Sequence, residues 1–258
     1  MSSRQARLRR LNAHPTQAGG DYVLYWAQAY RRLSHNHSLD DAIRCADELG
    51  RPLVVYEGLR LDYPWASARL HRFVLEGMRD NAAQARRLGI NYWPFVETER
   101  APARGLLARL ASRAAVVVTD DFPCFIVPEQ SEALARRVSV PVWAVDGNGV
   151  VPLSLLQPAV SAAAHLRPRI HKAFAEAWGH RAAARPRFPD AVRARVDAPF
   201  DVWEPPQDLD AFVASLPIDQ SVAPVDETRG GVKAARVRLR SFVKHRLAGY
   251  AESRSQPA

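Results

Sequence analysis

Five short runs of apolar, β-branched and aromatic residues recur along the chain and constrain its fold more than any other feature. Each run is apolar almost throughout, which is typical of a strand that is buried on both faces of a parallel sheet. A strand with one face in water would alternate apolar and polar residues instead. The runs are residues 21–26 (DYVLYW), 52–57 (PLVVYE), 90–95 (INYWPF), 114–119 (AAVVVT) and 140–146 (VPVWAVD).

Amphipathic segments lie between these runs and predict the crossover helices. They cover residues 38–49, 65–88, 103–113 and 129–137, and the longest ends at Gly89. Because crossovers between parallel strands are right-handed, the alternation predicts an α/β fold with a doubly wound, five-stranded parallel sheet of the Rossmann-like order 3-2-1-4-5. This order has a switch point between strands one and four, where we expect ligands to bind.

The chain divides into four parts by composition. Residues 1–20 are basic and are expected to be a disordered tail, and residues 21–179 hold the α/β domain. Residues 180–229 are rich in proline, which predicts a linker, and residues 230–258 predict a basic helix and tail after Gly230-Gly231. No internal repeat is visible.

The formal net charge of +9 favours attraction to a polyanion such as DNA, although a charged helix face is more often simply solvated. Cys45 and Cys124 are isolated and form no zinc or disulfide pattern. No run of eighteen apolar residues and no signal-peptide core is present, so we expect a cytoplasmic protein with no membrane association.

The loops after strands one and four contain the candidate binding residues. They combine aromatic rings with amides and carboxylates, which suits a flat, polar ring system. The candidates are Trp26, Gln28, Tyr30, Asn36, Asp120, Asp121 and Phe122. The alternative is that the two aromatic residues are ordinary packing and that the polar groups cap helices or accept backbone hydrogen bonds.

Several common catalytic patterns are missing from the sequence. No glycine-rich phosphate loop follows strand one, and no G-x-S-x-G elbow surrounds a serine, which argues against dehydrogenase, P-loop and hydrolase functions. His35 and His37 flank Asn36, but no further ligands converge on them, so no metal site is predicted. The residues therefore indicate no catalytic group.

Several segments, in the same order, resemble the class II cyclobutane pyrimidine dimer photolyases. They are VLYWAQAYR (23–31), Arg69-x-x-x-Phe73-x-x-x-Gly77, VVTDDFP (117–123), VDGNGVVP (145–152), RPRIHK (167–172), IDQSVAPV (218–225), Gly230-Gly231 and the L-x-x-Y-A-E-x-R pattern from Leu247 to Arg254. The resemblance covers about residues 21–257. Departures from the family pattern are His37, the sequence Cys124-Phe125-Ile126, and Ser255.

The resemblance implies a domain associated with light-dependent DNA repair. In this family a helical domain follows the connector, holds FAD and receives the lesion, and we find no counterpart of it here, so the chain is expected to be catalytically incomplete. The matching half packs against the flavin domain and in many members holds an antenna pigment, deazaflavin or folate. The resemblance would place that pigment at the strand-end candidates named above, of which Asp120, Asp121 and Phe122 match the family's loop.

Two other functions remain open on the sequence. Related α/β folds bind adenine nucleotides at the same switch point, so the chain could be a stand-alone nucleotide-binding module. The basic helix could instead make the chain a structural partner of a separately encoded flavin domain, or it could fold back on its own α/β domain. DNA contact is expected to be weak or indirect.

Overall fold

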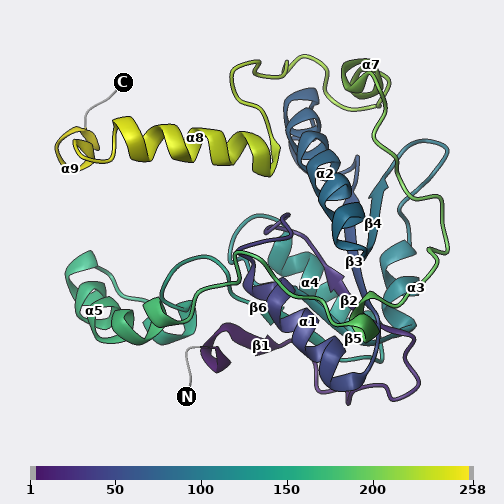
Figure 1. The fold of residues 1–258 in the computed structure, drawn as a ribbon, viewed down its shortest axis with the longest axis horizontal. Coiled ribbons are helices and arrows are strands. Elements are labelled where there is room, and N and C mark those ends of the chain that lie inside the picture. The colour runs from purple at the N-terminus through teal and green to yellow at the C-terminus, as the bar shows by residue number, and fades with distance from the viewer. Residues whose placement is uncertain (1–3, 256–258) are drawn as a thin grey trace.

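The computed structural model describes residues 4–255, and its centre is a six-stranded sheet with helices on both faces (Figure 1). The strands lie in the order β1-β6-β5-β2-β3-β4. They are β1 (Leu8–Arg10), β2 (Tyr22–Trp26), β3 (Leu53–Leu59), β4 (Asn91–Val96), β5 (Ala114–Asp120) and β6 (Val142–Val145). The five predicted strands are β2 to β6, they are parallel to one another, and their predicted order is confirmed.

The predicted crossover helices are all present, with ends that differ by a few residues from the predicted ones. They are α1 (His37–Leu49), α2 (Ala68–Leu88), α3 (Leu106–Ser112) and α4 (Val127–Arg137). The long helix α2 ends at Gly89, whose φ of 65° places it in the left-handed region that favours glycine. Trp65 precedes α2 rather than starting it, because Ser67 is the N-cap residue.

Both faces of the sheet are buried, as its apolar strands predict. Tyr22, Leu24 and Trp26 of β2 pack with α3 and α4, whereas Val23 and Tyr25 pack with α1 on the opposite face. This division follows from the alternation of side chains along a strand. The core therefore consists of two apolar layers that share the central strands.

The N-terminal segment differs from the prediction. Residues 5–7 form a short 3-10 helix, and β1 pairs antiparallel with β6, so the sheet is mixed rather than wholly parallel. The buried Arg7 fixes this segment by donating to the carbonyl oxygens of Asp146, Gly149 and Val150. A disordered tail over residues 1–20 is thus wrong for residues 5–10. Residues 1–3 and 256–258 lie outside the described part of the chain.

The proline-rich segment 180–229 is irregular for most of its length, but it packs closely on the domain. It contains α6 (Asp190–Arg193) and α7 (Leu209–Ala214), and Val192 is fully buried against α1 and the sheet. The ring of Phe200 meets the edges or faces of Tyr56, Trp93 and Phe95 at centroid distances of 6.3, 6.2 and 5.6 Å. This segment therefore acts as a strap over the domain.

Two helices outside the sheet crossovers project away from the α/β body toward the same side (Figure 1). They are α5 (Ala163–Gly179) and α8 (Gly231–His245), and the short α9 (Tyr250–Ser253) follows α8. The single basic helix predicted near the C-terminus is thus broken into two. No helix within residues 4–255 is long and apolar enough to cross a membrane.

Gly20 provides a test of this packing, because the chain enters β2 against the backbone of β5. A Cβ atom at Gly20 would lie 2.2 Å from the Ala115 backbone nitrogen. We expect Gly20→Ala to lower the free energy of unfolding by about 2 kcal/mol or more, through overpacking against rigid backbone. Urea denaturation measures the change.

The neighbouring Gly19 is the matched control, since a Cβ atom there meets nothing within 4 Å. Gly19→Ala should change the stability by no more than about 0.5 kcal/mol. Equal changes in the free energy of unfolding for the two substitutions would show that the Ala115 backbone leaves room for a Cβ atom at Gly20.

Candidate functional site

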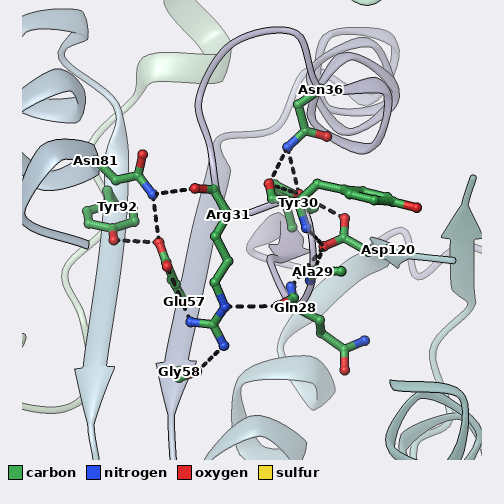
Figure 2. Close-up of polar contacts among 11 residues, drawn as sticks. Gln28, Ala29, Tyr30, Arg31, Asn36, Glu57, Gly58, Asn81, Tyr92 and Asp120 are labelled. Atoms are coloured by element: carbon green, nitrogen blue, oxygen red, sulfur yellow. Dashed lines mark hydrogen bonds and ion pairs between the residues drawn. The ribbon is translucent and has the colours of Figure 1, made fainter. Parts of the chain in front are cut away.

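The carboxyl ends of β2, β3 and β5 meet at one edge of the sheet, where the turn after β2 is held from two sides (Figure 2). On one side Asp120, at the end of β5, is buried with 1% of its surface exposed. One of its carboxylate oxygens accepts hydrogen bonds from the backbone nitrogens of Gln28, Ala29 and Tyr30 at 2.8–2.9 Å. Three converging amides stabilise the buried negative charge in place of water.

The other oxygen of Asp120 accepts a 2.9 Å hydrogen bond from the Tyr25 hydroxyl. Burial, followed by the charge of Asp120, raises the pKa of Tyr25, so that this hydroxyl stays protonated and can donate. The Asn36 amide nitrogen in turn donates to Tyr25 at 2.8 Å and to the Tyr30 carbonyl at 2.9 Å. These bonds link the beginning and the end of the turn.

On the other side of the turn a second buried carboxylate, Glu57 of β3, is held by three donors. Tyr92 donates at 2.7 Å, Asn81 at 2.9 Å, and the Arg31 guanidinium lies 3.3 Å away. Arg31 also donates to the carbonyls of Gln28 and Gly58 at 2.8 and 3.0 Å, and so ties the turn to β3. Figure 2 shows Arg31 between the two carboxylate networks.

Three further predicted site residues also have partners within the protein. Asn36 is the N-cap of α1, because its side-chain oxygen accepts from the backbone nitrogens of Ser38 and Leu39. Gln28 donates to the hydroxyls of Thr119 and Ser131, both at 2.8 Å. Asp121 forms a two-point ion pair with Arg9 of β1.

The structure therefore brings the predicted residues to one edge but does not present most of them to solvent. Only Asp121 and Phe122 are half-buried. Each of the others is at most 9% exposed, namely Trp26, Gln28, Tyr30, Asn36 and Asp120. These five side chains match the alternative interpretation, in which the aromatic residues pack in the core and the polar residues cap a helix or accept backbone hydrogen bonds. They stabilise this edge of the sheet.

The aromatic side chains that do face solvent at this edge come from the loop after β3 and from a later part of the loop after β5. Trp65, from the loop after β3, is 74% exposed, and Phe125, from the loop after β5, is 49% exposed. Their rings stack with centroids 5.5 Å apart and planes 20° apart. Tyr63 meets Phe125 edge to face at 6.4 Å. We call Tyr63, Trp65 and Phe125 the aromatic shelf.

The backbone of the aromatic shelf is strained at two positions. Trp65 has a φ of 66° and Phe125 a φ of 63°, in the left-handed region that bulky residues rarely adopt. Such a conformation costs on the order of 1–3 kcal/mol and persists only where the surroundings impose it, which is frequent at ligand sites. The surrounding structure therefore imposes the backbone conformation in which the two exposed rings stack.

His71 supports the aromatic shelf from below. It is fully buried, and its ring stacks on Tyr63 at 5.5 Å and 17°. Burial lowers its pKa, so the imidazole is neutral, with one nitrogen donating and the other accepting. Nε2 lies 3.2 Å from the Arg60 carbonyl, and Nδ1 lies 3.2 Å from the Ser67 carbonyl and 3.3 Å from the Tyr63 hydroxyl. The neutral ring donates to one of the two carbonyls, and Nδ1 can accept from Tyr63 when Nε2 is the donor.

Sequence reasoning missed the aromatic shelf because it considered only the loops after β2 and β5 and stopped at Phe122. The signals were present in the Tyr63-Pro64-Trp65 turn after β3 and in Phe125 after Pro123. In the described part of the chain, no group of three or more histidine, cysteine, aspartate or glutamate side chains is arranged to hold a metal ion.

A curated protein is similar to part of this chain. The deoxyribodipyrimidine photo-lyase of Methanothermobacter thermautotrophicus is 37% identical over 147 residues. Over these residues the chain is similar to a DNA photolyase. The match covers 57% of this chain but only 32% of the relative. No protein-family model matches.

A solved photolyase has the same fold. The crystal structure of a bacterial class III photolyase from Agrobacterium tumefaciens superposes with a TM-score of 0.51 at 18% sequence identity. This chain aligns over 91% of its own length and 47% of the length of that protein. At this identity the likeness concerns the fold alone, and it supports the α/β class derived above. The chain spans less than half the length of both proteins.

The Asp120 carboxylate can be tested against its neighbour in the chain. We expect Asp120→Asn to lower the free energy of unfolding by about 2–4 kcal/mol, because an amide cannot replace a charged acceptor for three backbone amides and a hydroxyl. Asp121→Asn, which removes a partly exposed ion pair with Arg9, should cost less than about 1 kcal/mol. Urea unfolding of both variants measures the difference, and equal losses would contradict the anchoring role of Asp120.

Proposed function

We propose that this chain is the α/β part of a class II photolyase and contributes to light-dependent repair of cyclobutane pyrimidine dimers in DNA. Within that function it would hold a flat antenna pigment, a deazaflavin or a folate, on the aromatic shelf. The relation to a photolyase over 57% of the chain supports the family, and the exposed stack of Trp65 on Phe125 supports the pigment. We also propose a cytoplasmic location, because the sequence contains no run of eighteen apolar residues.

The aromatic shelf suits a planar ring for three physical reasons. One face of Trp65 is covered by Phe125, yet 74% of the residue remains exposed, so a ring face is free for stacking. The shelf lies at the carboxyl ends of parallel strands, where open α/β sheets bind ligands. Its two rings are already stacked without a ligand, which would lower the entropic cost of ordering them on binding.

The chain's own residues would bind and orient the pigment, and they would do no covalent chemistry. The pigment would supply the absorption of light and pass excitation energy onward, whereas FAD and the repair step are assigned to a flavin-binding part of the photolyase. Tyr63, which stacks on the buried His71, would position Phe125 relative to the sheet. The hydrogen bonds of Asp120 and Glu57 would keep the strand ends from moving. The role of this chain is therefore positional.

The proposal is tested by pigment binding to the purified full chain. We expect a deazaflavin or a reduced folate to bind with one-to-one stoichiometry, seen as quenching of tryptophan fluorescence and by equilibrium dialysis. Trp65→Ala and Phe125→Ala should each weaken binding by about tenfold or more, because a stacked ring pair contributes on the order of 1–3 kcal/mol per base-sized ring. Trp178→Ala is the matched control, since Trp178 is also exposed, at 48%, but lies on α5.

The same titration separates the proposal from a nucleotide-binding module. If ATP or AMP binds more tightly than either pigment and raises the melting temperature, the adenine-nucleotide function replaces the antenna function. If no planar ligand binds, or if Trp65→Ala binds as well as the natural chain, the aromatic shelf is not the site. Repair of dimer-containing DNA by this chain alone with FAD under blue light would contradict the assignment of the repair step to a separate flavin-binding part.

A further inference from the structure

The start of α1 is a junction that joins α1, the end of β6, the strap and the N-terminal segment. The Ser38 hydroxyl donates to the Val145 carbonyl of β6 at 3.3 Å. The His35 backbone nitrogen donates to the Ala183 carbonyl of the strap at 2.7 Å, and the Ala183 nitrogen donates to the Asp40 carboxylate at 2.8 Å. The first turn of α1 therefore contacts β6 and the beginning of the strap.

The N-terminal segment enters the same junction through Arg7. This side chain is buried, and it donates to the carbonyl oxygens of Asp146, Gly149 and Val150 at 2.6–3.1 Å. The Arg7 carbonyl in turn accepts from the Asp146 backbone nitrogen at 2.9 Å. The short edge strand β1 is therefore attached to the sheet beside a guanidinium that is removed from water.

His37, the first residue of α1, is half-buried in this junction. Burial, and next the Arg7 guanidinium, lower the pKa of His37 to about 4. Asp146 opposes this effect, whereas Arg32 and His180 add to it. The imidazole is therefore neutral at neutral pH. A proton on the ring would place a new positive charge beside Arg7 and at the positive N-terminal end of α1.

We propose that this junction is a pH-sensitive latch, in which a neutral His37 keeps the N-terminal segment on the sheet and a protonated His37 releases it. A charged ring is poorly solvated in the closed junction and repels Arg7. Separation of residues 4–12 from the body relieves both effects, because Arg7 belongs to that segment and β1 is an edge strand of three residues. The latch goes beyond the proposed function and does not depend on the pigment.

The direction of the pH dependence follows from the pKa of His37 in the two forms. The opened form has the ordinary histidine pKa of about 6.5, whereas the closed form has a pKa of about 4. The opened form therefore binds more protons between these values, and the closed form loses stability as the pH falls from about 6.5 to about 4. Asp40 and Asp41 do not cause this loss, because burial raises the pKa of both carboxyls and so favours the closed form in acid.

The test measures hydrogen exchange of the full chain by mass spectrometry at about pH 7.5 and about pH 5, corrected for the intrinsic exchange rate at each pH. We expect the opening equilibrium of the peptide that contains β1 to rise about tenfold or more at the lower pH. Strands β2 and β5 are the internal reference, because they lie at the centre of the sheet and open only when the domain unfolds. His71, whose pKa burial also lowers, lies on α2 and would not affect β1 alone.

Two substitutions assign the pH dependence to one side chain. His37→Gln should abolish the rise at β1, because a glutamine amide is polar but does not take up a proton in this range. His35→Asn is the matched control and should retain the rise. His35 is exposed two positions away, and asparagine tolerates its φ of 50°.

Three results would overturn the proposal. The first is an equal rise in exchange at β1 and at the central strands, which would show acid unfolding of the whole domain. The second is an unchanged pH dependence at β1 in His37→Gln. The third needs no variant: if an NMR titration of the folded natural chain gives His37 a pKa near 6.5, the closed junction does not disfavour the proton.

Discussion

The Asp120 carboxylate accepts hydrogen bonds from three successive backbone amides of the turn after β2, and the rest of this edge of the sheet depends on that contact. A buried carboxylate is stable only when donors replace the water it has lost. Here the donors belong to a neighbouring strand's turn, so satisfying the charge also locks β5 to β2. Arg31 extends the arrangement to Glu57 and β3, and three strand ends become one rigid unit.

This rigidity separates the residues that shape the edge from those available to a ligand. Most polar groups of the turn are hydrogen-bonded within the protein, with the buried Gln28 Oε1 as an exception, so they maintain geometry rather than offer hydrogen bonds outward. The accessible chemistry lies instead in Trp65 and Phe125, two exposed rings in strained conformations above the rigid base. Strain at exposed positions persists only on a stable support, and the His71–Tyr63 stack provides it.

The C-terminal half has a different physical character. The strap buries Val192 and packs the partly buried Phe200 against the domain. In contrast, α8 contacts α2 through Gly230 and two carboxylates near its start and is exposed beyond them. The exposed apolar residues of α8 lie beyond these contacts.

The sequence by itself determined the five parallel strands, their order and their crossover helices, because buried strands and amphipathic helices leave a periodic pattern that needs no knowledge of contacts. It also indicated the photolyase relation through ordered motifs. Only the tertiary structure decided that Asp120 and Asn36 face inward and that Trp65 and Phe125 stack at the surface. It alone added the antiparallel β1. These outcomes depend on which distant segments meet, and a strand-end residue has the same local pattern whether its side chain turns toward the core or toward water.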